Sequence, residues 1–288
     1  MALNYFSDRA KHNAAQALLY KTTGFLSDKM PRLALWLGRH MLLRPFGKRV
    51  KHFERVTPHS HWSFNTRQGL VKVHLFGDSG PWVVTSHGWA DNSRCFETMI
   101  PSLLEQGFRV AAIDHVAHGK SGGKHAHLLA FIEAKEALLA HFKQQEQKVA
   151  AIIGHSMGGL AALNLKAEYL QGLKVILIAM PIRMFDLMFV QVERMGISRK
   201  MLTLVLERIS AQYQTSWQQL QYQHHLHKCA DRLFLIHDTD DKFAPIEHIR
   251  AVSEQQGTPL YLTQNLGHNK LLRDTGVIRQ ISSILVGT

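Results

Sequence analysis

The sequence predicts an α/β protein with a mostly parallel β-sheet that helices cover on both faces. Apolar stretches of strand length alternate with stretches of helical periodicity from about residue 60 to the C-terminus. The apolar stretches are continuous rather than alternating, which is typical of strands buried on both faces. The chain has 288 residues, enough for one large α/β domain with a sizeable core.

The elements of this domain are expected in a regular order. The expected strands are residues 64–66, 70–76, 82–85, 108–113, 149–153, 173–179, 232–236 and 260–262. The expected helices are residues 96–104, 128–142, 157–170, 245–255 and 269–286. The first two strands flank the turn Arg67-Gln68-Gly69, so they are expected to form a hairpin.

Two segments depart from this alternation. Residues 1–60 are expected to be a basic helical N-terminal extension with two amphipathic helices, the second of which has Pro31 in its first turn. Residues 182–230 keep helical spacing and are expected to be a helical cap. This insertion would divide the core into a first part, 61–181, and a second part, 231–288.

Methionine clusters at the start of the insertion. Five of the ten methionines lie in positions 180–201: Met180, Met184, Met188, Met195 and Met201. Met side chains adapt to varied apolar shapes, so Met184 and Met188 are predicted to bind substrate in an apolar pocket. The alternative is that these side chains are ordinary helix core.

Positive charge is concentrated at the N-terminus. The net charge is +12, and residues 1–60 hold 11 basic and 3 acidic side chains. This distribution argues against a domain-wide nucleic-acid surface. The extension also carries an apolar stripe: Leu33, Leu35, Trp36, Leu37, Met41 and Leu42. Either the stripe packs within the chain and the charge is solvated, or the extension makes peripheral contact with an anionic membrane.

A cytoplasmic location is expected. No apolar run approaches the roughly 18–20 residues of a membrane span, and the N-terminus lacks a secretory pattern. The two cysteines, Cys95 and Cys229, form no disulfide framework, which favours a reducing compartment. The sequence does not indicate an oligomeric state.

The segment with the clearest chemistry is Gly154-His155-Ser156-Met157-Gly158. It follows an apolar strand and precedes a helix, the context that a G-x-S-x-G turn requires. Glycines allow a turn tight enough to raise Ser156 above the sheet at a helix N-terminus, where backbone N–H groups favour developing negative charge. Ser156 is therefore predicted to be a nucleophile.

A serine nucleophile needs a base and an acid that orients the base. His268 follows the last predicted strand and supplies the base. Acidic side chains at positions 238, 240 and 241 follow the strand before it. The chain order Ser, Asp, His is the order expected of this arrangement.

These residues resemble the serine-dependent α/β-hydrolase superfamily across roughly residues 70–286. His87-Gly88-Trp89 resembles the family's oxyanion segment, and residues 114–121 resemble its D-x-x-G-x-G-x-S loop, with Ala117 in place of the first glycine. The acid segment resembles G-x-x-D-x-x-x-P, with Asp238 in place of the glycine. By this alignment Asp241 is the acid and Asp240 is the alternative.

The resemblance implies the role of each residue. Ser156, His268 and Asp241 would be catalytic. The backbone N–H groups of Trp89 and Met157 would form the oxyanion hole. A further set would contact substrate: His87, Gly88 and His155, together with Met184 and Met188.

The predicted activity is hydrolysis of carboxylic esters with an apolar acyl group through an acyl-enzyme, with no metal or organic cofactor. A thioesterase or a lipid-acting lipase is the nearest alternative, and a noncatalytic binding protein on the same fold is the alternative of a different class. The segment that contains His224, His225, His227 and Cys229 matches no standard zinc spacing. Whether His115, His118, His125 and His127 line a loop near the site is left open.

Overall fold

The structure is a computed structural model that describes residues 13–46 and 52–287. The chain divides into two compact units. Of the described residues, one unit comprises 13–44 and 183–221, and the other comprises 45–46, 52–182 and 222–287. The first boundary between these units falls at residue 44, and the N-terminal helices share a unit with most of the insertion.

The larger unit is built on one eight-stranded sheet with the order β1-β2-β4-β3-β5-β6-β7-β8. β1 pairs antiparallel with β2 and β2 with β4, and all other neighbours are parallel. This arrangement confirms the predicted sheet. The strands are β1 Ser60–Thr66, β2 Gly69–Phe76, β3 Trp82–Ser86, β4 Arg109–Asp114, β5 Val149–His155, β6 Lys174–Ile178, β7 Leu233–Asp238 and β8 Leu260–Thr263.

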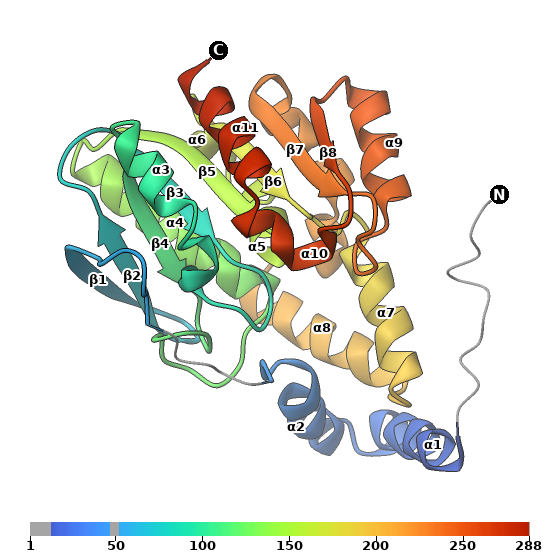
Figure 1. Ribbon diagram of the computed structural model, residues 1–288. Helices are drawn as coiled ribbons and strands as arrows, with labels where there is room; N and C mark the ends of the chain where they lie inside the picture. Colours follow the sequence, from blue (N-terminus) through green and yellow to red (C-terminus); the bar gives the residue numbers. More distant parts are fainter. Residues whose placement is uncertain (1–12, 47–51, 288) are drawn as a thin grey trace. The chain divides into compact units, whose positions relative to one another are not determined.

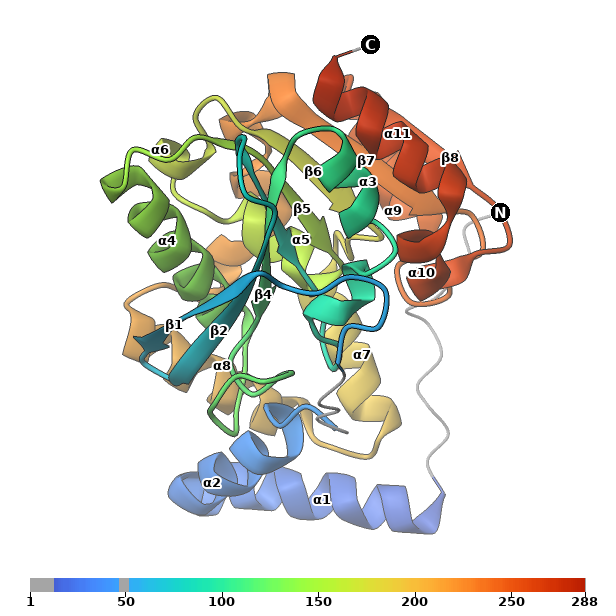
Figure 2. The ribbon, with the colours of Figure 1, turned by 60° about the vertical axis from the view of Figure 1, so that its left-hand side comes forward.

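Helices cover both faces of this sheet, with α3 and α11 on one face and α4 and α5 on the other (Figures 1 and 2). The helices are α3 Ile100–Glu105, α4 Leu128–Gln144, α5 Met157–Leu163, α6 Ala167–Leu170, α9 Ile246–Gln256, α10 Gly267–Lys270 and α11 Thr275–Val286. Short 3₁₀ turns complete the unit: η1 Ser93–Phe96, η3 Tyr222–His224, η4 Leu226–Lys228, η5 Ala230–Arg232 and η6 Leu271–Arg273. The α/β class with helices on both faces is therefore confirmed.

Three of the expected helices are broken in the structure. Residues 96–104 divide into η1 and α3, because Pro101 favours the first turn of a new helix. The helix expected at 157–170 becomes α5 and α6. The last helix starts afresh at Asp274, whose side chain caps α11 by accepting from the Val277 N–H at 2.9 Å.

The core lies where the sheet meets the helices. All five residues of β3 are buried, which explains why residues 82–84 are continuously apolar. Phe96, Ile100 and Ile281 pack with strand residues in a single cluster of buried side chains. Full burial of one such side chain stabilises the fold by about 1.5–3 kcal/mol, so this cluster holds the sheet rigid beneath the loops at its carboxyl ends.

The smaller unit consists of helices: α1 Ala14–Lys29, α2 Pro31–Leu42, α7 Met184–Arg194, α8 Arg199–Tyr213 and the 3₁₀ turn η2 Trp217–Leu220. Asn13 and Gln16 form a reciprocal capping box at the start of α1. α1 and α2 both pack against α8. The absence of a side chain at Gly38 admits Val205 of α8, since a Cβ there would lie 2.8 Å from the Val205 side chain.

The apolar stripe of the N-terminal extension is partly buried and partly exposed. Four of its members are half-buried: Leu35, Leu37, Met41 and Leu42. Leu33 and Trp36 are exposed. Among residues 13–46 and 52–287, no helix is long and apolar enough to cross a membrane.

Candidate active site

Ser156 occupies a strained turn between β5 and α5. Its backbone has φ 51° and ψ −124°, a region that L-residues rarely adopt. Glycine is required on both sides: a Cβ at Gly154 would lie 2.5 Å from the Gly159 Cα, and one at Gly158 would lie 2.2 Å from the Ser86 carbonyl oxygen. The expected sharp turn is therefore present, and it puts Ser156 at the N-terminus of α5.

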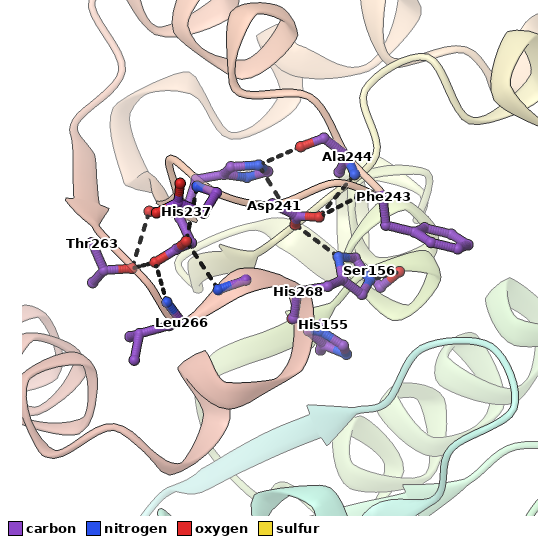
Figure 3. A network of polar contacts seen from close by, with 12 residues as sticks. His155, Ser156, His237, Asp241, Phe243, Ala244, Thr263, Leu266 and His268 are labelled. Carbon is purple, nitrogen blue, oxygen red and sulfur yellow. Dashed lines mark hydrogen bonds and ion pairs between the residues drawn. The ribbon is translucent and has the colours of Figure 1, made fainter.

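Ser156, His268 and Asp241 form a continuous hydrogen-bonded chain (Figure 3). The Ser156 Oγ lies 3.0 Å from the His268 Nε2, and the His268 Nδ1 lies 2.8 Å from the Asp241 carboxylate. An ionised carboxylate only accepts, so Nδ1 carries the proton and Nε2 accepts from the Ser156 hydroxyl. The three residues follow strands β5, β8 and β7, whose carboxyl ends meet at one edge of the parallel sheet.

The acid that contacts His268 is Asp241 and not Asp240. The Asp241 side chain is fully buried, and its second oxygen accepts from the backbone N–H groups of Phe243 and Ala244 at 2.8 and 3.0 Å. Burial raises the pKa of Asp241, but the hydrogen bonds from His268 and from those two N–H groups lower it by more. The pKa of Asp241 therefore lies below its ordinary value. The exposed Asp240 instead accepts from the Asn265 N–H at 2.7 Å.

Asp238 has a part in the site that the sequence did not reveal. Its buried carboxylate accepts four hydrogen bonds: the backbone N–H groups of Asp240, Leu266 and Gly267 and the hydroxyl of Thr263, at 2.9, 3.1, 2.9 and 2.7 Å. It therefore ties the acid loop after β7 to the segment that leads into His268. The only signal in the sequence was that Asp238 stands where the family pattern has glycine.

His155 lies beneath His268 rather than in an open pocket. It is buried, and its Nε2–H donates to the His268 carbonyl at 2.9 Å (Figure 3). Burial, with the charge of nearby His268, lowers the pKa of His155 to about 4, so the ring is neutral at neutral pH. The geometry thus makes His155 a support for the base, whereas the sequence predicted contact with substrate.

The His-Gly segment lies directly against the serine. A Cβ at Gly88 would approach the Ser156 Cβ at 2.8 Å and the His155 Nδ1 at 3.2 Å, so only glycine fits there. Trp89, the next residue, is partly exposed. Met157 is the first residue of α5, and the first N–H groups of a helix have no partner within it. These are the two backbone positions expected to form the oxyanion hole.

Buried histidines form hydrogen bonds with the backbone of this segment. The His87 Nδ1–H donates to the Gly88 carbonyl at 2.7 Å, while the His87 Nε2 accepts from the His115 N–H at 3.0 Å. The His118 Nε2 accepts from the Ala90 N–H at 3.1 Å. Burial lowers the pKa of His87 to about 4 and of His118 to about 3. Both rings are therefore neutral acceptors, and His87, predicted to contact substrate, is enclosed under the loop.

In the loop after β4, Ala117 stands where the family pattern has glycine. Ala117 has φ 63°, in the left-handed region that favours glycine. Gly119 has φ 47°, and a Cβ there would lie 2.2 Å from the Asp114 carboxylate. That carboxylate accepts from the Lys120 N–H at 2.7 Å and the Ser93 N–H at 2.8 Å, which braces the loop against η1.

The predicted pocket methionines lie in the other unit. Met184 and Met188 belong to α7, so their contact with substrate stays a prediction. Phe243 in the acid loop was not predicted, although its ring lies 5.2 Å from that of His268 and its side chain is exposed (Figure 3). Among the residues that the structure describes, no group of three or more His, Cys, Asp or Glu side chains is placed to hold a metal ion.

Comparison with known proteins shows which family the chain resembles. A family model described as serine aminopeptidase, S33 (Hydrolase_4) matches residues 78–244, more than half of the chain. A serine hydrolase-like protein of Danio rerio is 34% identical over 125 residues, which cover 42% of this chain and 38% of the relative. A monoacylglycerol lipase of Mycolicibacterium smegmatis is 33% identical over 91 residues, which cover 30% and 32%.

Solved structures share the fold over most of their length. An esterase of Pyrococcus furiosus aligns with a TM-score of 0.60 at 17% identity, covering 85% of this chain and 97% of that one. A monoacylglycerol lipase of Paleococcus ferrophilus aligns with a TM-score of 0.54 at 19% identity, covering 75% and 98%. At these identities the likeness shows the fold alone.

The sheet, the strained serine turn and these matches together define a serine α/β-hydrolase. The chain belongs to the family of the serine aminopeptidase S33 model. It spans less than half the length of the curated relatives named above.

Proposed function

We propose that the protein hydrolyses carboxylic esters with an apolar acyl group, with Ser156 as the nucleophile. The observation that carries this proposal is the chain of hydrogen bonds from Ser156 through His268 to Asp241, at 3.0 and 2.8 Å. The first distance lies within the range in which a base can take a proton from a nucleophile, and the second is a hydrogen bond by which an acid orients that base.

The first half of the reaction forms an acyl-enzyme. His268 Nε2 takes the proton of the Ser156 hydroxyl as its oxygen attacks the ester carbonyl carbon. The ionised Asp241 stabilises the imidazolium that results and keeps the ring in the productive tautomer. His268 then gives the proton to the departing alcohol oxygen as the ester bond breaks.

The negative charge of the tetrahedral intermediate needs donors placed in advance. The backbone N–H groups of Trp89 and Met157 are the proposed donors, because Gly88 brings one segment against Ser156 and α5 begins at Met157. The rings of His87 and His118 hold the first segment through hydrogen bonds to its backbone. Loss of one such donor typically slows turnover by about 10²–10³-fold.

Water completes the second half. His268 removes a proton from water, which attacks the acyl carbon, and then returns the proton to the Ser156 oxygen as the acid leaves. No metal or organic cofactor has a part in these steps.

An apolar acyl group is proposed because of the side chains near the nucleophile. Phe243 is exposed beside His268, and Trp89 is partly exposed beside Gly88. The monoacylglycerol lipase among the relatives acts on a lipid ester by its name, so monoacylglycerols are one member of the proposed class.

The decisive test is covalent labelling. A fluorophosphonate probe should label the protein at Ser156, and Ser156→Ala should abolish labelling while the thermal unfolding temperature stays close to that of the native protein. A protein that resists labelling, yet is folded, would be a noncatalytic binder on the hydrolase fold.

A substrate panel then separates the classes that this apparatus serves. The panel contains p-nitrophenyl esters of increasing acyl length, a monoacylglycerol, an acyl-CoA and an amino-acid p-nitroanilide. The proposal predicts the highest kcat/KM on esters of medium or long acyl chains. Preference for acyl-CoA would assign a thioesterase, and preference for the p-nitroanilide would assign the peptidase activity in the family's name.

A further inference from the structure

The outer faces of α1 and α2 present large apolar side chains to solvent. On α1, Leu18 is 67% exposed and Phe25 is 60% exposed, and they lie seven positions apart on one helix face. On α2, Leu33 is 42% and Trp36 is 60% exposed, three positions apart. Single exposed apolar residues are ordinary, but four on two helices that pack together mark an interaction surface.

Packing inside the smaller unit uses the opposite faces of these helices. Thr23 is fully buried on α1, and its hydroxyl oxygen accepts from the Ser198 N–H at 2.9 Å. On α2, Ala34 is fully buried and Gly38 lies against α8. The four exposed side chains are therefore not needed to attach the helices, and their apolar surface calls for another explanation.

Positive charge accompanies this apolar surface. Residues 14–44 contain five basic side chains, all of them exposed: Lys21, Lys29, Arg32, Arg39 and Arg44. The single acidic side chain in that stretch is Asp28, whose carboxylate pairs with Lys200 at 2.5 Å. The charge of the segment 14–44 is thus strongly positive, which complements an anionic partner.

We infer that the outer face of α1 and α2, defined by Leu18, Phe25, Leu33 and Trp36, docks on an anionic membrane surface, to which the five basic residues of segment 14–44 are attracted. Cations beside apolar side chains match a lipid interface, where headgroups take the charge and the acyl boundary takes Phe and Leu. Trp is enriched at that boundary because its ring is amphipathic. A nucleic acid would use the charge but would leave the aliphatic side chains in water. The inference does not depend on the proposed esterase activity.

Cosedimentation of the full chain with lipid vesicles tests the inference. The protein should bind vesicles of phosphatidylcholine containing phosphatidylglycerol at low salt, and it should bind less at high salt because salt screens the attraction. Binding to vesicles of phosphatidylcholine alone should be much weaker.

Two matched pairs of charge variants distinguish this face from overall charge. Each basic residue near an anionic surface contributes about a fivefold factor in partitioning, so Lys29→Gln with Arg32→Gln should weaken binding roughly 25-fold. Lys124→Gln with Lys148→Gln removes the same charge from exposed positions of the larger unit. That control pair should change binding less than twofold.

The apolar part has its own variant. Phe25→Ser with Trp36→Ser should weaken binding at least about tenfold, since both side chains are expected to leave water. Val286→Ser, which alters an exposed apolar residue at the end of α11, should have no effect. Circular dichroism melts check that each variant is folded.

Several outcomes would overturn the inference. One is the absence of binding to anionic vesicles at low salt. Equal losses from the two charge pairs would show attraction to overall charge instead. Full binding by the Phe25 and Trp36 double variant would remove the apolar contribution. Concentration-dependent dimerisation without lipid, abolished by that same double variant, would assign the face to a second copy of the chain.

Discussion

Asp238 offers a test of how the base is held in place. Its carboxylate accepts four hydrogen bonds, three of them from backbone N–H groups and two of those from Leu266 and Gly267, just before His268. Asp238→Asn keeps the size of the side chain but turns one acceptor oxygen into an NH₂ donor. That NH₂ group then faces donors, so about two hydrogen bonds to a charged acceptor are lost.

The size of the effect follows from these contacts. A hydrogen bond to a charged group contributes about 1.5–3 kcal/mol, so two lost bonds destabilise the native state by roughly 3–6 kcal/mol. The freed segment also lets His268 shift, and a misplacement of about 1 Å can slow turnover by about 10²-fold. We therefore expect a clearly lower melting temperature and a kcat lowered about 10- to 100-fold with KM nearly unchanged.

The assay is steady-state hydrolysis of a p-nitrophenyl ester together with a thermal melt. Asp240→Asn is the matched control, because Asp240 is exposed and an asparagine oxygen can still accept from the Asn265 N–H. A kcat within twofold of the native value for Asp238→Asn at a temperature where it is folded would refute the positioning role. Equal effects of the two substitutions would refute it as well.

Three further predictions concern the loops around the site. Asp241→Asn should lower kcat about 10⁴-fold in the same ester assay, because an amide that donates favours the wrong tautomer of the base, whereas Asp240→Asn should retain activity. Mild acid should destabilise the fold, because burial lowers the pKa of His87 to about 4 and of His118 to about 3, while the ordinary value in the unfolded chain is near 6.5. Below pH 6.5 the unfolded chain binds more protons than the native protein, so acid favours unfolding. Each ring lowers the free energy of unfolding by about 1.4 kcal/mol at pH 5.5. An unchanged melting temperature between pH 8 and 5.5 would contradict this. Ala117→Gly should raise stability by about 1 kcal/mol in denaturant melts because the backbone there is left-handed, and Gly119→Ala should lower it, since its Cβ would collide with a carboxylate.

The parts of the fold that were predictable from the sequence are those with a local cause. Continuous apolar stretches located the central strands, such as β6, because burial on both faces requires them, and the structure has a strand at each expected place. The serine turn was predictable because its glycines meet backbone atoms of neighbouring strands and helices and admit no other residue. Helix ends were less predictable: the break before α11 depends on the single cap at Asp274.

The support beneath the site was not predictable, because it depends on partners far away in the chain. His87 and His118 were visible as histidines near a glycine, yet their hydrogen bonds join residues 28 positions apart. His155 contacts a carbonyl 113 positions away. A pattern within one segment carries no information on such pairs. The sequence therefore predicted substrate contact for His87 and His155, whose rings are buried in the structure.

Asp238 shows how a departure from a family pattern can be interpreted. A buried carboxylate is costly unless donors surround it, so an acid in place of glycine at the end of β7 implies that donors converge there. The donors come from the acid loop itself and from the segment before His268, the two parts of the chain that must stay aligned for a serine, histidine and aspartate to act together. Asp238, in place of the family's glycine, therefore links the loop that carries the acid to the segment that carries the base through its hydrogen bonds.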